Sequence, residues 1–477
     1  MLRSFPVLYF ALALLAGCSI GPDFQRPATA VPAAYKEADF LATAESDWKL
    51  AVPGEVDQSP WWESFEDTVL SDLMARLEGA NQNVQAALAN LRLARAQARE
   101  ARAAFFPSLG AVESNVQRQV GTSYPVTTHT AQLQASWELD IWGGTRRSAE
   151  SAEAAAEAAS ADLGAVILSA RGELAQSYFQ LRAYDDLIAL YRQTIEAYEK
   201  SLAISTNQFK AGIVTKIDVA QAITQLKAAQ AQLVEQELQR RQMEHSMAAL
   251  LGLPPSGFSL APAPFDAKIP VIDAGIPSYL LERRPDIARG ERRVAAANAK
   301  IGVAQSAHFP SLTLNAAGGF VSAILGKWFT APMQVWSFGP SIALSLFQGG
   351  ADIARADQAV ASWEASVASY RHAVLAALVE VEDQLAAAML LQQEEVIQLE
   401  ALASAREAEA LAINRYQAGL TTYLTVVTAQ ATALINARTA VTLKGRRYLA
   451  AVALIRALGG GWDSTEGLKA DGEGPAQ

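Results

Sequence analysis

The longest pattern in the chain is a seven-residue repeat of apolar positions from Ile167 to Phe209. Tyrosines recur at the same interval three residues after several of these positions, which is the a/d seam of a helix packed along a partner in a left-handed supercoil. The seam comprises Ile167, Leu174, Leu181, Ile188, Ile195, Leu202 and Phe209, with Tyr184, Tyr191 and Tyr198. Because no proline interrupts residues 145–209, the pattern predicts a helix of roughly 100 Å, at ~1.5 Å per residue, that ends at Ala211-Gly212.

Two stretches with a period of two come before this helix. Residues 130–142 alternate between apolar side chains, such as Leu133, and polar ones, such as Gln134. The alternation is typical of a membrane strand with one face on lipid and one on water, and equally of a half-buried strand in a soluble sheet. We expect strands at about Ser108–Gln119 and Thr130–Trp142, a polar loop over Gly121–His129, and one alanine-rich helical stretch from Leu70 to Phe105.

The same succession of patterns occurs twice. Phe106-Pro107-Ser108-Leu109 returns as Phe309-Pro310-Ser311-Leu312, an offset of 203 residues, and Leu251-Gly252 returns as Leu458-Gly459, an offset of 207 residues. The nearly constant offset predicts a duplicated unit that consists of a helix, a strand pair, a long helix, a turn and a return helix.

The second copy differs from the first in its seam. Its second strand alternates over Trp336–Leu346, and its seam runs from Val374 through Leu399 to Tyr416. Four polar residues interrupt this seam: Gln392, Glu395, Arg406 and Glu409. We therefore expect a more polar helix interface in the second copy.

These patterns favour a mainly α fold with a small β part. The expected segments are a signal peptide at 1–17, an extended stretch at 18–60, the first repeat at 61–253, a proline-rich linker at 254–277, the second repeat at 278–459 and a disordered tail at 460–477. Four strands cannot close a membrane barrel, and open strand edges are not tolerated in lipid, so membrane strands would require several chains to share one barrel. A soluble sheet with four helices is the alternative, but it leaves the helix length unexplained.

The N-terminus has the pattern of a lipoprotein signal. Arg3 precedes an apolar run that is too short to span a bilayer and that ends in Leu15-Ala16-Gly17-Cys18. This resembles a bacterial lipoprotein signal, whose processing leaves Cys18 as a lipidated first residue that anchors the protein in membrane lipid; an ordinary signal peptide with an incidental cysteine is the alternative. Cys18 is the single cysteine, so an internal disulfide is impossible. Ser19, where an aspartate would retain such a protein at the inner membrane, favours the outer membrane.

Charge and chemistry exclude other classes of function. The net charge of -10 and the lack of a basic block argue against nucleic-acid binding. The four histidines are scattered, without the spacing of a metal site, and no nucleophile elbow, phosphate loop or H-E-x-x-H motif is present. We therefore expect no enzyme activity, no cofactor and no metal.

Three groups of residues match a known family. They are Cys18-Ser19-Ile20-Gly21-Pro22-Asp23-Phe24 with Pro27, Trp61-Trp62-Glu63-Ser64-Phe65 with Asp67, and Arg283-Arg284-Pro285-Asp286-Ile287 continuing through Glu291, Ala296, Asn298, Ile301-Gly302 and Phe309-Pro310. Over nearly the whole chain the sequence resembles the TolC-like outer membrane efflux family, in the lipoprotein branch that is paired with resistance-nodulation-division pumps. The resemblance implies a homotrimer with a twelve-stranded barrel in the outer membrane above a periplasmic helical tunnel. It also implies a passive exit duct that is engaged by a periplasmic membrane-fusion adaptor and an inner-membrane resistance-nodulation-division pump.

The resemblance further implies roles for the two hairpin turns. The positions that would meet the adaptor are Gly212, Ile213 and Thr215 in the first turn and Gly419, Leu420 and Thr422 in the second. Leu424 has the position of a leucine ring that closes the tunnel, and Thr428 stands where some members have an aspartate. Asp218 is the acid that remains near this gate. The glycines could equally serve only the turns, and Asp218 could be a solvated helix carboxylate.

The leading functional hypothesis is therefore the outer-membrane channel of a tripartite pump that exports small toxic compounds. A duct for type I protein secretion is a second hypothesis, and a structural periplasmic lipoprotein without a pore is a third.

Overall fold

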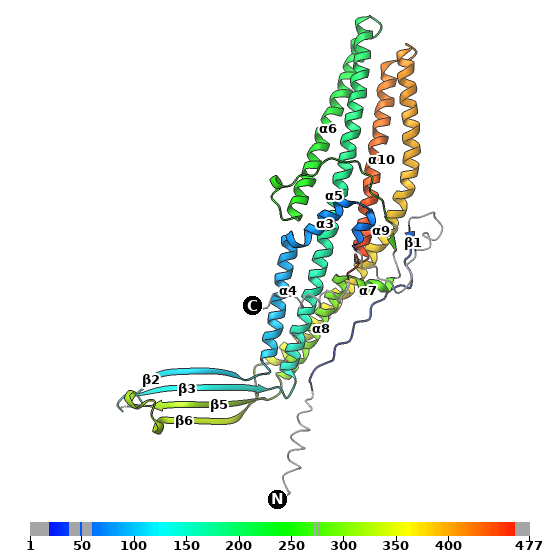
Figure 1. Ribbon diagram of the computed structural model, residues 1–477. Helices are drawn as coiled ribbons and strands as arrows, with labels where there is room; N and C mark the ends of the chain where they lie inside the picture. Colours follow the sequence, from blue (N-terminus) through cyan, green and yellow to red (C-terminus); the bar gives the residue numbers. More distant parts are fainter. Residues whose placement is uncertain are drawn as a thin grey trace. The chain divides into compact units, whose positions relative to one another are not determined.

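The computed structural model describes residues 19–37, 48–49, 60–121, 123–270, 272–273 and 277–462 (Figure 1). The expected signal peptide, Cys18 and residues 463–477 of the expected tail lie outside this part of the chain. The chain folds as two compact units. Unit 1 takes the residues up to Thr29, Ala89–Ser160 and Ala288–His372, and unit 2 takes the remaining segments, so each unit contains parts of both repeats.

Unit 1 contains a four-stranded antiparallel sheet in the order β2-β3-β5-β6 (Figure 1). Its strands are β2 (Ser108–Arg118), β3 (Val126–Leu139), β5 (Ser311–Ser322) and β6 (Gln334–Ala343). A single row of the register joins Leu109, Ala135, Ala316 and Phe338 across the four strands. Because side chains alternate between the two faces of a sheet, this register brings the apolar positions in the half of the sheet next to the helices to one face. In the far half of β2 the pattern breaks, because Val116 lies on the opposite face and Glu113 shares the face of Leu109.

The ends of two strands differ from the predicted ones. The strand predicted at Thr130–Trp142 runs from Val126 to Leu139, because its polar first residues still pair with β2 and because Asp140 ends it. The Asp140 carboxylate accepts hydrogen bonds from the backbone N–H groups of Thr145 and Arg146, at 3.0 and 2.8 Å, and so begins the next helix. The polar loop is correspondingly shorter than Gly121–His129.

The other difference concerns the strand predicted at Trp336–Leu346, which ends at Ala343. Ala343 pairs with Ser311, the first residue of β5, and the residue before Ser311 is Pro310. Proline has no N–H to donate, so β6 has no hydrogen-bonding partner beyond this point.

The predicted long helix is confirmed and occurs twice. Helices α5 (Gly144–Lys210) and α9 (Ala351–Gln417) each have 67 residues, and the return helices α6 (Lys216–Leu250) and α10 (Tyr423–Ala457) each have 35. No helix in the described residues is both long and apolar enough to cross a membrane.

The alanine-rich stretch from Leu70 to Phe105 is two helices and not one. Helix α3 (Thr68–Ala80) ends at Asn81, and α4 (Gln82–Ala103) begins there. The buried Asn81 side chain accepts from the N–H groups of Asn83 and Val84, at 2.9 and 3.1 Å, and donates to the Leu250 carbonyl at 2.8 Å. This is an N-cap that starts a new helix within an otherwise continuous pattern.

In the second repeat, α7 (Leu280–Arg283) and α8 (Pro285–Ser306) correspond to α3 and α4. The remaining elements are short. They are the 3-10 turns η1 (Trp61–Phe65), η2 (Pro255–Gly257), η3 (Pro277–Tyr279), η4 (Leu325–Lys327) and η5 (Ala331–Met333), and the parallel pair β1 (Trp48–Lys49) and β4 (Ile272–Asp273).

Most of the predicted seam of α5 lies in the core of unit 2. Leu174, Leu181 and Tyr191 are buried, but Phe209 is 43% exposed. Phe209 is outside the core cluster near the turns, which is centred on Tyr416 and Tyr423 and takes Leu202 and Ile204 from α5. The seam of α9 follows the prediction at Val381, Leu402 and Tyr416, which are buried, and departs from it at Leu399, which is 51% exposed.

Candidate functional site

The two faces of the sheet have opposite chemistry. On the apolar face, Leu109 and Phe338 are 73% and 71% exposed in the single chain. On the polar face, the Ser136 hydroxyl donates to Asn315 Oδ1 at 3.1 Å, and the Asn315 amide donates to the Ser341 hydroxyl at 3.0 Å. A face of bare apolar side chains opposite a face of hydrogen-bonded polar ones suits a wall between lipid and water.

Aromatic side chains lie at both ends of this sheet. At the helical end, Trp142 stacks on Phe309 with ring centroids 4.8 Å apart, and Trp137 Nε1 donates to the Phe105 carbonyl at 3.0 Å. At the other end, Phe329 contacts both Phe320 and Trp328, at 5.5 and 4.9 Å, and Trp328 lies 5.5 Å from His129. Bands of aromatic residues at both ends of an apolar surface are typical of the two interfaces of a membrane.

The two hairpin turns have nearly the same backbone. Gly212 and Gly419 both have a φ of 73°, a left-handed conformation that glycine adopts without strain. The N–H of Ile213 donates to the Gln208 carbonyl at 2.9 Å, and that of Leu420 donates to the Arg415 carbonyl at 2.8 Å. This bond satisfies a free carbonyl at the helix end, as in a Schellman motif. The exposed Ile213 and Leu420 therefore project from rigid turns.

The structure gives Asp218 a definite local role. Its carboxylate accepts from both the backbone N–H and the hydroxyl of Thr215, at 2.9 and 2.8 Å, at the start of α6. A threonine followed three residues later by an acid is a capping box, a signal that is readable in the sequence. The hydrogen bonds of Asp218 thus go to its own helix cap and not to Leu424 or Thr428.

The expected gate residues lie on the first turns of α10. Leu424 is 57% exposed, whereas its neighbour Tyr423 is buried in the cluster with Tyr416. The Thr428 hydroxyl donates to the Leu424 carbonyl of its own helix at 2.9 Å. Burial, with smaller contributions from Tyr416 and from the charge of Asp218, raises the pKa of Tyr423 to about 12. Leu424 therefore faces away from the packed core, next to a tyrosine that stays neutral.

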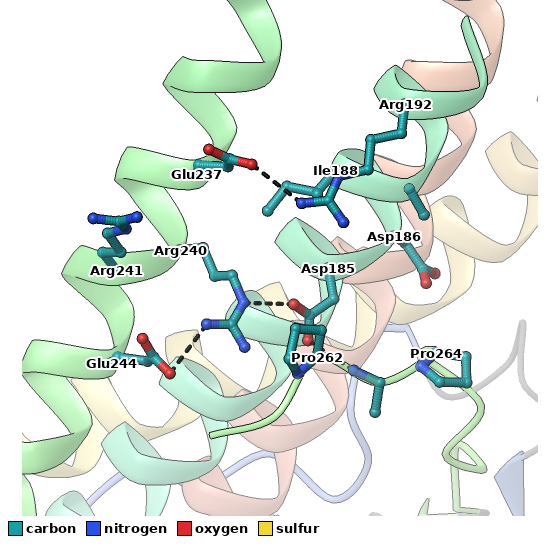
Figure 2. Close-up of a pocket in the computed structure, with 12 residues that line it drawn as sticks. Asp185, Asp186, Ile188, Arg192, Glu237, Arg240, Arg241, Glu244, Pro262 and Pro264 are labelled. Atoms are coloured by element: carbon teal, nitrogen blue, oxygen red, sulfur yellow. Dashed lines mark hydrogen bonds and ion pairs between the residues drawn. The ribbon is translucent and has the colours of Figure 1, made fainter. Parts of the chain in front are cut away.

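A buried ion network holds the linker between the repeats against the first hairpin. Arg240 of α6 pairs with Asp185 on α5 at 2.6 Å and with Glu244 at 3.0 Å (Figure 2). Asp185 also pairs with Arg182 at 2.9 Å. Arg182 donates to the Ala261 carbonyl at 2.9 Å.

The same network also binds the linker through its other members. Arg240 donates to the Leu260 carbonyl at 2.6 Å, and Glu244 accepts from the Leu260 N–H at 2.8 Å. The adjoining cavity of about 490 Å³ is bordered by Arg192, Glu237 and Pro262 (Figure 2). Because the buried charges are matched by each other and by linker backbone, this cluster fixes the chain path and does not leave a free charge for a ligand.

Two of the family-like motifs are parts of cores. Phe65 is fully buried in an aromatic cluster with Phe179 and Tyr448, and Asp67 caps α3 and accepts from the Tyr178 hydroxyl at 2.6 Å. Arg284 is buried and binds three elements: it pairs with Asp286 at 2.7 Å and with Glu380 at 2.8 Å, and it donates to the Ala457 carbonyl at 2.8 Å. Within the described residues, no group of three or more metal-binding side chains is present.

The sheet and the paired long hairpins define the TolC-like class of channel proteins. A solved structure described as the outer-membrane channel OprN matches with a TM-score of 0.86 and 31% identity, over 93% of this chain and 100% of that chain. The family model for outer membrane efflux proteins matches residues 73–253 and 276–460. The chain belongs to the outer membrane efflux protein family, which is a family of channels and not of enzymes.

Two relatives from Pseudomonas aeruginosa show how far the likeness extends. OpmQ, a pyoverdine export outer membrane protein, is 33% identical over 442 residues, which is 89% of this chain and 93% of the relative. The outer membrane protein OprJ is 32% identical over 482 residues, 98% of each chain. This chain therefore functions as an outer-membrane efflux channel.

Proposed function

We propose that three copies of this chain form one channel, in which their sheets close a twelve-stranded barrel and their hairpins continue it as a periplasmic tunnel. The observation that carries the proposal is the sheet itself. Over the half next to the helices it has one apolar and one polar face, and its edge strands β2 and β6 each offer a row of backbone groups for pairing. Lipid does not tolerate such edges, and pairing β2 of one copy with β6 of the next removes them all.

The channel is a passive exit duct of a tripartite pump. The projecting Ile213 and Leu420, with Gly212, Thr215, Gly419 and Thr422, are the proposed contacts for a periplasmic membrane-fusion adaptor. Three copies of the exposed Leu424 would narrow the tunnel near these turns, with Thr428 one helical turn behind and the Asp218 caps close by. Energy and substrate selection would come from an inner-membrane resistance-nodulation-division pump.

Conductance in planar bilayers tests the duct. The purified wild type is expected to insert and to show a low, gated conductance, and Leu424→Ser is expected to raise the open probability severalfold. Val360→Ser, at another exposed apolar position of a long helix, is the matched control and should leave the conductance unchanged. Absence of conductance in every variant would instead support a structural lipoprotein without a pore.

Interchain disulfides test the barrel. Cysteines placed in turn at Gly110, Val112 and Ser114 of β2, each combined with Ser337→Cys on β6, are expected to cross-link three chains at one register. Single-cysteine variants are the controls. If no combination cross-links in the outer membrane, the shared barrel is refuted.

Efflux is favoured over protein secretion, because OpmQ is a pyoverdine export protein. The lipoprotein-type N-terminus and the Arg283–Ile287 motif also resemble those of the pump branch. A drug-susceptibility panel on a deletion strain would identify the exported compounds. For the lipid anchor at Cys18, Cys18→Ser is expected to abolish acyl labelling and globomycin-sensitive processing, and unchanged labelling would contradict the assignment.

A further inference from the structure

The loop between β5 and β6, residues 323–333, has a backbone that is fixed by its own hydrogen bonds. The hydroxyl of the buried Ser322 accepts from the Ile324 N–H at 3.0 Å and donates to the Ile324 carbonyl at 2.9 Å. Further along, the Lys327 N–H donates to the Ile324 carbonyl at 3.0 Å, and the Thr330 hydroxyl donates to the Lys327 carbonyl at 2.7 Å. Because these bonds need no partner strand, the loop keeps its side chains in defined directions.

The β5–β6 loop bends toward the apolar face of the sheet. Trp328 lies against His129 of β3, and Phe329 contacts Phe320 of β5. His129 and Phe320 each stand an even number of positions from the register row through Ala135, so both side chains are on the apolar face. The loop therefore lies on the side that the proposed barrel turns to lipid, and away from its lumen.

The apolar side chains of the loop are not placed where the next copy would pair. The loop leads into the edge strand β6, but its Trp328 reaches back across β5 to β3, which is on the other side of β5 from β6. It thus rests on the two inner strands of its own sheet. Ile324, Leu325 and Phe329 are each more than half exposed, and pairing of strand edges would not cover them.

The apolar face ends at the level of this loop. On β3 its apolar positions run from Leu139 to Ala131, and the next position on the same face is His129, which pairs with Ser322. From residue 139 to residue 131 the strand extends about 27 Å, at ~3.4 Å per residue, and a strand tilt of about 40° reduces this to a height of roughly 20 Å. The apolar band of outer-membrane barrels is about 25 Å tall, so the loop lies where the lipid head groups begin.

The loop also carries an isolated positive charge. Lys327 is exposed, and it is the single charged residue in the whole stretch 311–350. Glu113, the acid on this face of the sheet, lies on the edge strand β2. A lysine between Leu325 and Phe329 can extend its ammonium group to a lipid phosphate while the apolar neighbours stay among acyl chains.

We propose that the β5–β6 loop is a binding site for an anionic lipid of the outer leaflet, in which Lys327 pairs with the lipid phosphate and Leu325 and Phe329 insert among the acyl chains. His129 is a positioning residue of this site, because its imidazole is hydrogen-bonded to Asn115 and packs against Trp328. The inference rests on the membrane sheet of the proposed function. It gives the loop a task at the level where the strands themselves no longer present an apolar face.

Quenching by nitroxide-labelled lipids tests whether the loop lies in lipid. In the full-length protein reconstituted into vesicles, a bimane label at Leu325→Cys should be strongly quenched by lipids that carry the nitroxide near the head group. A label at Tyr124→Cys, in the β2–β3 loop beyond the last paired row of the sheet, is the control and should be quenched several-fold less. A label at Leu325→Cys that is shielded from nitroxide lipid and from iodide alike would place the loop against another protein chain and overturn the proposal.

The lipid preference of the same label tests the phosphate contact. In vesicles of phosphatidylcholine, the nitroxide is carried at equal mole fraction by either phosphatidylglycerol or phosphatidylcholine. The ratio of the two quenching constants is expected to be about two to five with Lys327 present and about one in Lys327→Gln. Arg118→Gln, on the opposite face of the sheet, is the matched control and should keep the higher ratio. A ratio that Lys327→Gln leaves unchanged, or a ratio of about one in both proteins, would refute the site.

A label in the middle of the apolar face separates this inference from the proposed function. Quenching at Phe338→Cys with none at Leu325→Cys would overturn only the loop site, whereas no quenching at either position would refute the membrane sheet itself. His129→Ala should lower the quenching at Leu325→Cys several-fold and leave that at Phe338→Cys unchanged, because it removes the support of Trp328 and not the strand. Unchanged quenching at both positions would refute the positioning role of His129.

Discussion

The first hairpin, α5 and α6, and the second, α9 and α10, have helices of equal length and nearly the same turn, but their helices are joined by different chemistry. At the offset of 207 residues, Ile188, Tyr191 and Leu202 of the first seam correspond to Glu395, Gln398 and Glu409 of the second. Glu395 pairs with Arg447 of α10, and Gln398 donates to Asn436 at 2.9 Å. Polar groups thus replace apolar seam residues in the second hairpin, as expected, but the first hairpin also has ion pairs between its helices, from Asp185 to Arg240 and from Arg192 to Glu237.

The surfaces of the two long helices differ as well. α5 exposes one large apolar side chain, Phe209, whereas α9 exposes several along its length. Among those of α9 are Leu390, Ile397 and Leu411, which are separated from one another by multiples of seven residues. An exposed heptad stripe needs a partner helix, which in the proposed trimer is a helix of the neighbouring copy. The comparison shows that two hairpins with equal helix lengths and equivalent turn glycines can have nearly the same backbone. Their side chains can nevertheless differ, so each hairpin packs against different neighbours.

The largest expected effect comes from the ion network of the first hairpin, in which Arg182 and Asp185 are buried. Asp185→Ala should lower the free energy of unfolding by about 3–5 kcal/mol, because it leaves Arg182 and Arg240 buried without their shared carboxylate. Gln392→Ala, at the corresponding position of α9, should change it by less than about 0.5 kcal/mol. Urea unfolding followed by circular dichroism in detergent measures both.

Limited proteolysis provides a second measure of the same network. Cleavage within residues 258–265 should become at least tenfold faster in Asp185→Ala and remain unchanged in Gln392→Ala. Equal sensitivity of the two variants would mean that the network does not hold the linker.

The next effect tests whether the two turns are equivalent. Proline cannot adopt the positive φ of Gly212 or Gly419, and the substitution also removes the Gly419 N–H bond to the Tyr416 carbonyl. Gly212→Pro and Gly419→Pro should each cost about 1–3 kcal/mol locally and should each weaken adaptor docking, measured by the yield of site-specific cross-linking. Gly257→Ala, in the linker, is the control. A wild-type yield for either proline variant would remove that turn from the docking surface.

A smaller effect should follow from the caps. The N-cap of α10 is Thr422, but Thr425 stands where α6 has Asp218, and Thr422 makes no side-chain capping bond. Asp218→Ala should destabilise the start of α6 by about 0.5–2 kcal/mol, and Thr425→Asp should stabilise the start of α10 by up to about 1 kcal/mol. Amide exchange of residues 217–220 and 424–427 reports each change separately. Faster exchange in α10 of the Thr425→Asp protein would contradict the capping argument.

The sequence was sufficient for features that depend on local pattern and insufficient for those that depend on distant partners. Proline-free heptads and glycine turns predict the 67-residue helices, because helix propagation and chain reversal are local. Asn81 and Asp140 are readable as helix caps: Asn81 divides the predicted single helix into two, and Asp140 ends β3 three residues before the predicted Trp142. The contact of Asp185 with Arg240 and the linker could not be predicted from the sequence. It depends on where the fold places the linker, which lies about 75 residues further along the chain.

The smallest expected effect is a pH dependence that only the second hairpin should have. Burial raises the pKa of Glu409 above its ordinary value, although the charge of Arg406 opposes this. The native state therefore binds the Glu409 proton more tightly than the unfolded chain does. The protonated carboxyl stabilises the native state at pH values below the ordinary pKa of a glutamate, and this stabilisation is lost as the pH rises through the raised pKa of the native state. Glu409→Gln should accordingly flatten the fall in thermal stability between pH 4.5 and neutral pH. The first hairpin should lack this pH dependence, because the residue that corresponds to Glu409 there is the uncharged Leu202. Glu407→Gln, at an exposed neighbour, should leave the slope unchanged, and an equal flattening by both would assign the effect to net charge alone.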